Sequence, residues 1–343
     1  MAGHPTPTSR LPRVPPPTTT PKMTTPAPTV STSTVISAEP PACLSFLPHS
    51  PSLLLVGTYT LHESATTLST QKTGSLCLYR APSLELLHTL ATPFGAVLDL
   101  KFSPSGEVAA VAVSRGVVTL VRVVCERIEI LRDIHVVDEE VLVLSVAWAP
   151  GGDAVGVSTS DGRVLFVRVD PAEVRWVTTP HSLEAWTVEF SRDGERLYSG
   201  GDDAVMVVTD VATGTETGRC RRGAHGAGVT AILAREGQEL WTGSYDEQLR
   251  VWDLRGRIGV EVEKGLGGGV WRLHEIADGR VLASCMHAGA RVVDRLVGGK
   301  GLEIVARWEE NESMNYGGHV HPNVPGVVAS CSFYDRRVAI WDV

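Results

Sequence analysis

The chain has 343 residues, 43% of them hydrophobic and 20% charged, so it is long enough to bury a sizeable core and has the composition of a soluble globular protein. Its net charge of −8 excludes a generally basic surface, and we expect neither nucleic acid nor a membrane as a partner. The six cysteines show no C-x-x-C pair and no zinc-like spacing with histidine, so we expect no metal, and nothing in the sequence requires a cofactor. Free thiols and a start without a secretory signal favour the cytoplasm.

The N-terminal segment is rich in proline and threonine. Residues 1–41 contain 11 Pro and 10 Thr and few large apolar side chains, so burial cannot offset the entropy lost on ordering them. We predict a disordered tail over residues 1–28. Residues 29–37, TVSTSTVIS, are β-branched and free of proline, which is typical of a strand.

From residue 42 onward the chain consists of repeats. Each repeat begins with an apolar strand that ends in a turn, and the residues just before these turns are Phe46, Phe102, Trp148, Phe190, Leu233, His274 and Val320. The successive separations are 56, 46, 42, 43, 41 and 46 residues, around the roughly 40–45 residues of one propeller blade. Apolar and polar residues alternate in the segments that follow, which indicates strands and not helices.

The repeats predict an all-β fold, a single seven-bladed WD-repeat β-propeller over residues 29–343, which we expect to be monomeric. The chain stops at Val343, on the third strand of the last blade, so that blade needs a fourth strand from elsewhere. The segment 29–37 is the expected donor. An N-terminal strand in this place closes the ring and hides sheet edges that an open array would leave unpaired.

Several residues at the ends of blades have the spacing of a structural network. Trp252-Asp253 and Trp341-Asp342 end third strands as the WD signature does. Asp203, Asp246 and Asp335 lie six residues before such ends, and with His225 we expect them to serve the framework. His287 occupies the same position in the sixth blade, where aspartate is expected, so a functional role is as well supported there as a structural one.

One face of the ring should carry the loops that enter the blades and the turns between second and third strands. In blades four to seven these segments contain the aromatic residues Trp186, Tyr245, Trp271, Tyr316 and Tyr334. Binding residues concentrate on such loops, so five aromatic rings around one opening predict a shared pocket, although each could be an ordinary surface residue. Asp202 is free to face this opening, whereas Glu184 and Arg272 either line the pocket or are solvated.

Residues 40–343 resemble the WD-repeat proteins of diphthamide biosynthesis, the diphthine methyl ester hydrolase family. The resemblance rests on an ordered set of motifs: GGDD at 200–203, TGSYDE at 242–247, GGGVWR at 267–272, CMHAG at 285–289, MNYG at 314–317 and CSFYD at 331–335. Gly318-His319 departs from the acidic and aromatic residues expected after Tyr-Gly in this family.

The resemblance implies an esterase that removes a methyl group from methylated diphthine on the histidine of translation elongation factor 2, its expected partner. Such chemistry needs an activated nucleophile and donors for the developing oxyanion. The sequence contains neither a G-x-S-x-G elbow nor an H-E-x-x-H motif. We therefore expect a composite catalytic set: His287 as general base or nucleophile activator, Asp202 as its partner, and Ser332 as nucleophile or oxyanion donor. The N–H groups of residues 267–269 are further candidate donors.

Diphthine carries a trimethylammonium group, which aromatic faces and carboxylates hold. The substrate-binding residues implied by this chemistry are Glu184, Trp186, Tyr245, Trp271, Arg272, Tyr316 and Tyr334. Two other functions fit the same sequence. A non-catalytic scaffold or adaptor is the commonest role of such propellers, and the fold alone implies no enzyme. A reader of trimethylated lysine would use the same cage without a catalytic His or Ser.

Overall fold

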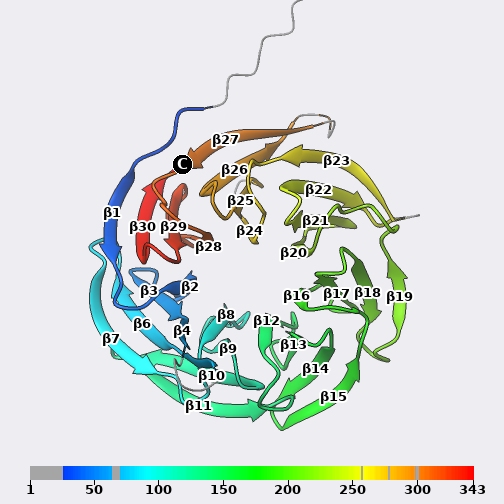
Figure 1. Cartoon of the computed structure of the whole chain (residues 1–343), viewed down its shortest axis with the longest axis horizontal. Helices are drawn as coiled ribbons and strands as arrows, with labels where there is room; N and C mark the ends of the chain where they lie inside the picture. The colour runs from blue at the N-terminus through cyan, green and yellow to red at the C-terminus, as the bar shows by residue number, and fades with distance from the viewer. Residues whose placement is uncertain (1–25, 64–69, 256–257, 277–278, 297, 299–300) are drawn as a thin grey trace, which may run out of the picture.

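The protein is a ring of seven four-stranded antiparallel sheets, the blades, and the prediction of a seven-bladed β-propeller is confirmed (Figure 1). The computed structural model describes residues 26–63, 70–255, 258–276, 279–296, 298 and 301–343. Most of the tail predicted to be disordered, residues 1–25, lies outside the described residues. Within these ranges no helix has the length and apolarity needed to cross a membrane.

Each blade runs from an inner strand on the ring axis to an outer strand at the rim. The first four blades consist of β2 (Pro41–Phe46), β3 (Leu53–Thr58), β6 (Ser75–Arg80) and β7 (Glu85–Ala91); β8 (Val97–Phe102), β9 (Ala109–Val113), β10 (Val117–Val124) and β11 (Arg127–His135); β12 (Val143–Trp148), β13 (Ala154–Thr159), β14 (Val164–Val169) and β15 (Ala172–Thr178); and β16 (Ala185–Phe190), β17 (Arg196–Gly201), β18 (Met206–Asp210) and β19 (Glu216–Arg219).

Blades 5 to 7 continue the pattern, and the last takes its outer strand from the N-terminus. They consist of β20 (Val229–Ala234), β21 (Glu239–Ser244), β22 (Gln248–Asp253) and β23 (Gly259–Gly265); β24 (Arg272–Glu275), β25 (Val281–Ser284), β26 (Ala290–Arg295) and β27 (Leu302–Trp308); and β28 (Asn315–Val320), β29 (Val327–Ser332), β30 (Arg337–Asp342) and β1 (Ser31–Ile36).

The core lies between the blades. Second strands such as β3 and β13 are buried along their whole length because each of their faces packs on a neighbouring blade. Outer strands such as β15 alternate between exposed and half-buried residues, as expected where only one face is covered. Seven apolar clusters result, one in each gap between blades, so every blade needs both of its neighbours.

The N-terminal strand closes the ring, as the sequence predicted. β1 pairs antiparallel with β30, with Ser33 opposite Ile340 and Val35 opposite Val338. The indole N–H of Trp308 in blade 6 donates to the Ser31 hydroxyl at 2.8 Å, so the first residue of β1 is also tied to the preceding blade. The last blade is therefore built from both ends of the chain.

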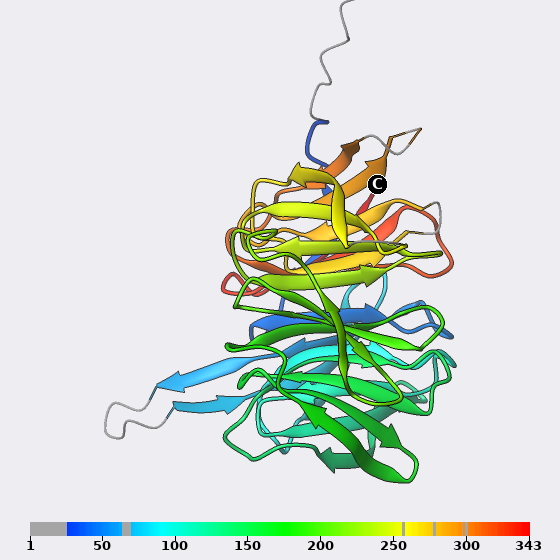
Figure 2. The same cartoon turned by 90° about the vertical axis from the view of Figure 1, so that its right-hand side faces the viewer.

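Blade 1 carries an insertion between its second and third strands. Strands β4 (Thr60–Glu63) and β5 (Thr70–Thr73) form a two-stranded hairpin, which with its flanking residues 59 and 74 we call the β4–β5 arm. The arm projects away from the ring (Figure 2). It accounts for the first and longest spacing between repeats, 56 residues, in the sequence.

Candidate functional site

The loops that enter the blades and the turns between second and third strands lie at one end of every blade, because successive strands are antiparallel. We call this end of the ring the site face. All the sequence motifs of blades 4 to 7 lie on it, in or beside the turns β17–β18, β21–β22, β25–β26 and β29–β30 and the loops that precede β16, β20, β24 and β28. The β4–β5 arm leaves the ring from the same face, because it replaces the corresponding turn of blade 1.

Three aspartates on this face serve the framework, as predicted. Asp246 accepts the backbone N–H of Gly226 at 2.7 Å and forms an ion pair with Arg250 at 2.8 Å. Burial tends to raise the pKa of Asp246, but the hydrogen bonds from Arg250 and Gly226 outweigh it and lower the pKa. Asp203 and Asp335 hold the entry loops of their blades in the same way, through the N–H groups of residues 182 and 312. These carboxylates tie turns to loops.

Two buried histidines belong to this framework as well. In blade 5, His225 and Trp252 both bond to the Thr242 hydroxyl, at 2.9 and 2.8 Å. Burial, aided by the charge of Arg250, lowers the pKa of His225 to about 4, so its imidazole is neutral. In blade 4, His181 lies 3.1 Å from Asp203.

His287 has none of these contacts. It lies in the β25–β26 turn, its side chain is exposed, and among the described residues no hydrogen bond or ion pair involves its ring. The backbone of the turn also differs. Met286 and Gly289 have a positive φ here, whereas in blades 5 and 7 the residue directly after the structural Asp has a positive φ. His287 therefore does not take the structural role that Asp has at this turn position in the other blades, and its imidazole is free to act on a ligand.

The aromatic side chains of the site face are contiguous. Trp186 lies 5.5 Å from Trp271 and 6.2 Å from Tyr245, and Trp271 lies 5.8 Å from Tyr245 and 5.1 Å from Tyr316, measured between ring centroids. Such separations are those of packed aromatic pairs. Four of the five aromatic residues named from the sequence therefore form one group that spans blades 4 to 7.

Two residues that the sequence did not single out extend this group. Phe333 packs 5.6 Å from Tyr316 and 5.0 Å from Tyr334, and Tyr59, at the base of the β4–β5 arm, lies 6.0 Å from Phe333. Tyr334, the fifth predicted residue, is 71% exposed at the outer end. We call the following residues the aromatic cluster: Tyr59, Trp186, Tyr245, Trp271, Tyr316, Phe333 and Tyr334.

Acidic groups lie at the blade 4 end of the aromatic cluster. The Trp186 indole N–H donates to Asp202 Oδ1 at 3.0 Å, and the backbone N–H of Asp202 donates to the carbonyl of Glu184 at 2.8 Å. Burial, followed by the neighbouring Tyr316 and Asp202, raises the pKa of Tyr245, so its phenol stays protonated. Among the described side chains, no hydrogen bond or ion pair joins Asp202 to His287; Asp202 is the partner of Trp186.

A basic group lies at the axis end of the cluster. The Arg272 guanidinium packs over the Trp271 ring, 5.2 Å from its centroid, and Arg272 Nε lies 3.7 Å from Asp99 Oδ1. Both side chains are buried. Asp99 is on β8 in blade 2, and the hydroxyl of Ser145, on β12 in blade 3, also donates to it at 2.8 Å. The Arg272–Asp99 pair thus joins blades on opposite sides of the ring axis (Figure 1), and a small cavity lined by Asp99, Arg272 and Tyr316 adjoins it.

Two further groups from the sequence analysis have unused polar atoms. The Ser332 hydroxyl is buried at the end of β29 and has no hydrogen-bond partner, so it is closed off from a ligand in this conformation. None of the N–H groups of residues 267–269 donates to a described residue, although Gly268 and Gly269 are buried. A Cβ at Gly269 would lie 2.7 Å from Met286 Sδ, so this loop packs directly on the turn that carries His287.

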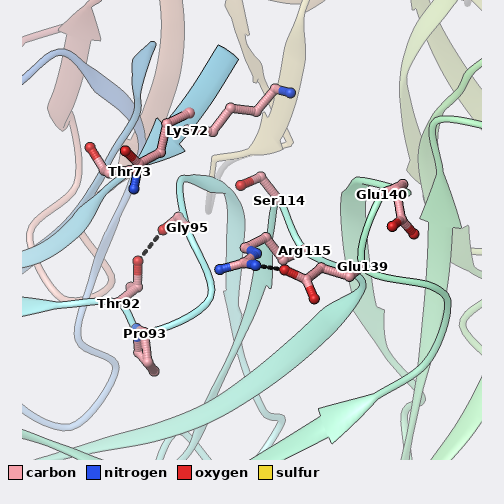
Figure 3. A pocket seen from close by; sticks show the side chains of 10 residues that line it. Lys72, Thr73, Thr92, Pro93, Gly95, Ser114, Arg115, Glu139 and Glu140 are labelled. Carbon is pink, nitrogen blue, oxygen red and sulfur yellow. Dashed lines mark hydrogen bonds and ion pairs between the residues drawn. The ribbon is translucent and has the colours of Figure 1, made fainter. Parts of the chain in front are cut away.

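A second hollow opens on the site face beside blades 1 to 3. It has a volume of about 640 Å³, and the residues that line it come from β5, the loop before β8, the β9–β10 turn and the loop before β12 (Figure 3). Two of its lining residues, Arg115 and Glu139, form an ion pair. Where the structure describes the chain, no cluster of three or more His, Cys, Asp or Glu side chains could hold a metal ion.

Comparison with known proteins finds relatives of this chain in sequence and in fold. No family model matches the chain. A Schizosaccharomyces pombe protein named diphthine methyltransferase is 36% identical over 301 residues, covering 84% of this chain and 90% of the relative. The Saccharomyces cerevisiae protein of the same name is 28% identical and covers 89% of this chain and 96% of its own length. A chain in the crystal structure of the mitotic checkpoint complex shares the fold, with a TM-score of 0.76, 15% identity and 96% of each chain covered.

Proposed function

Because the chain belongs to the family of proteins named diphthine methyltransferase, an enzyme family of diphthamide biosynthesis, we propose that it hydrolyses the methyl ester of methylated diphthine on translation elongation factor 2. Hydrolysis frees a carboxylate and releases methanol. The name of the relatives speaks of methyl transfer on diphthine, and loss of the ester methyl group to water is the specific reaction that we propose. The reaction would occur in the cytoplasm, on a folded protein substrate, with the enzyme acting as a monomer.

The observation that carries this proposal is the aromatic cluster with charges of opposite sign beside two of its rings, the Asp202 carboxylate at Trp186 and the Arg272 guanidinium over Trp271. A trimethylammonium group donates no hydrogen bonds, and aromatic faces bind it through their negative quadrupole. Trp186, Tyr245 and Trp271 offer three mutually packed rings beside the carboxylate of Asp202. This end of the cluster would hold the ammonium, with Glu184 adding negative charge.

The positive charge of Arg272 suits the ester group of the substrate. Arg272 lies beside Trp271 and Tyr316, and its guanidinium would attract the ester carbonyl and the carboxylate of the product. Asp99 holds this guanidinium in place from across the ring. A substrate bound between Asp202 and Arg272 would therefore have one orientation, with the ammonium toward blade 4 and the ester toward the axis.

The attack on the ester is assigned to water. His287 has a free imidazole, so it would accept a proton from the water as its oxygen bonds to the carbonyl carbon. The tetrahedral oxyanion would be stabilised by the unused N–H groups of residues 267–269 and by Arg272. When the C–O bond to the methoxy group breaks, the proton held by His287 passes to this leaving group, which departs as methanol. The buried hydroxyl of Ser332 is not suited to attack, and we keep it outside this scheme.

The test is incubation of the purified protein with elongation factor 2 that carries the methyl ester, followed by mass spectrometry of the modified peptide. We expect the peptide to lose the mass of one methylene group and methanol to appear in equal amount. Elongation factor that carries the free acid is the matched control and should keep its mass. A gain of one methylene mass on the free acid, in the presence of a methyl donor, would contradict hydrolysis. Tight binding of the ester without turnover would favour the scaffold or reader functions.

A further inference from the structure

The β4–β5 arm is not needed by the fold. Blade 1 already has four paired strands, and β3 and β6 pair up to Gly57 and Leu76, directly below the arm. In blade 2 the same position is a short turn between Val113 and Val117. A lone two-stranded hairpin is at best marginally stable in water, and Leu61 of β4 is 46% exposed. The arm therefore adds little to the core, which suggests that it serves an external contact.

The arm stands between the aromatic cluster and the 640 Å³ hollow. On one side, Tyr59 at its base packs on Phe333 of the cluster. On the other, β5 contributes Lys72 and Thr73 to the wall of the hollow (Figure 3). The two sites are thus on the same face of the ring and share one element.

The lining of the hollow is polar and charged. Arg115 and Glu139 neutralise each other, whereas Lys72 and Glu140 have no ion-pair partner among the described residues. A pocket for a small ligand is mostly apolar with a few polar groups, but this one is lined by lysine, arginine, two glutamates, serine and threonines. Polar, charged surroundings are typical of the rim of an interface between proteins.

We infer that the β4–β5 arm and this hollow form a docking site for the folded surface of the protein substrate that surrounds its modified side chain. This inference rests on the proposed function, because it requires the modified side chain to enter the aromatic cluster at the same time. Lys72 would meet an acidic group of the partner and Glu140 a basic one. The arm would thereby favour a protein substrate over a small one, since a free small ester could occupy the aromatic cluster but not the hollow.

The experiment compares a protein substrate with a small one in charge-reversal variants of the hollow. The variants are Lys72→Glu and Glu140→Lys, and Lys264→Glu on the outer strand of blade 5 is the matched control. The protein substrate is elongation factor 2 with the methyl ester. The small substrate is betaine methyl ester, in which a trimethylammonium group neighbours a methyl ester, assayed against its spontaneous hydrolysis.

We expect each variant of the hollow to raise KM for the protein substrate by about tenfold with kcat unchanged, and the effect to shrink at high salt, because charges at an interface rim act on encounter. Turnover of betaine methyl ester should be the same in all four proteins, and Lys264→Glu should match the wild type with both substrates. An unchanged KM for the protein substrate, or a parallel loss with both substrates, would overturn the docking site.

Failure of the proposed function has a different signature. If the wild-type protein hydrolyses neither ester, the chemistry is wrong, and docking is then measured by titration with unmodified elongation factor 2. Weaker binding by Lys72→Glu and Glu140→Lys, but not by Lys264→Glu, would still support the docking site. Equal binding by all four proteins would overturn it.

Discussion

At the scale of single residues, His287 and Asp246 occupy the same turn position in adjacent blades but have opposite surroundings. Asp246 bonds to Gly226 and Arg250, whereas the ring of His287 forms no hydrogen bond or ion pair with a described residue. His287→Ala should therefore abolish ester hydrolysis and leave the melting temperature unchanged. Asp246→Ala should retain the chemistry but lower the free energy of unfolding by about 1–3 kcal/mol, because Arg250 loses its buried partner. Turnover by His287→Ala at the wild-type rate would show that another group is the base.

Trp271 is the residue on which the cage depends most, because it contacts Trp186, Tyr245 and Tyr316. A cation–π contact contributes roughly 0.5–2 kcal/mol, so Trp271→Ala should weaken binding of the methylated substrate about two- to thirtyfold. Trp271→Phe, which keeps a ring, should recover part of the loss. Titration calorimetry with modified and unmodified elongation factor measures both. Equal weakening for the two ligands would place Trp271 in a general protein interface and not in a cage.

At the scale of elements, β1 contributes the edge that closes the ring. Deletion of residues 1–27 removes no residue of β1 and should leave the melting temperature nearly unchanged. Deletion of residues 1–38 exposes the edge of β30 and removes the contact of Ser31 with Trp308, so it should lower the melting temperature sharply. Calorimetry measures both melting temperatures, and the shorter deletion is the control for the longer one. The same melting temperature for both would contradict closure by this strand.

The sequence predicts the elements well because their patterns are local. Turn residues and alternating strands repeat in each blade, and the β-branched run at 29–37 is the only candidate for the missing strand near the N-terminus. In the sequence, the β4–β5 arm is apparent only as the long separation of 56 residues between the first two repeats. No pattern in its sequence distinguishes this hairpin from a loop. The contact of Tyr59 with Phe333 joins residues near opposite ends of the chain, so no local pattern indicates it.

The site was predictable in part, for a related reason. The aromatic residues of blades 4 to 7 were placed together because equivalent turns of adjacent blades must be neighbours in a ring. Asp99 could not be found in this way. It belongs to an ordinary strand of blade 2 and acquires its role only because a long Arg272 side chain crosses the axis from blade 6. Contacts across the ring depend on its diameter, which no single repeat encodes.

At the scale of the whole molecule, the axis of the ring gathers titratable groups whose protonation depends on burial. Glu189 of blade 4 is the clearest example, because burial raises its pKa to about 7. The charges of Lys101 and Arg192 act to lower this pKa, and that of Asp99 acts to raise it. The ordinary pKa of a glutamate side chain is 4.5. A folded-state pKa above the unfolded value means that the stabilising contribution is complete below pH 4.5 and is lost as the pH rises through 7.

Glu189→Gln should therefore raise the free energy of unfolding at pH 8 by about 1–3 kcal/mol and change it little at pH 5. Histidine side chains with lowered pKa values, such as His319 at about 3, have the opposite dependence, and they are present in both proteins. Urea unfolding of wild type and variant at the two pH values isolates the carboxyl group. An equal difference at both pH values would mean that Glu189 is charged throughout this range.

The central claim is that water, activated on this ring, removes the methyl group from the ester. The most direct measurement is a single turnover of methylated elongation factor 2 in water enriched in heavy oxygen, with wild type and His287→Ala side by side. We predict that the wild-type product loses one methylene mass and carries one heavy oxygen atom in its carboxyl group, while the His287→Ala reaction leaves the ester intact. A demethylated product without heavy oxygen would contradict the account, because the methyl carbon and not the carbonyl carbon would then have been attacked.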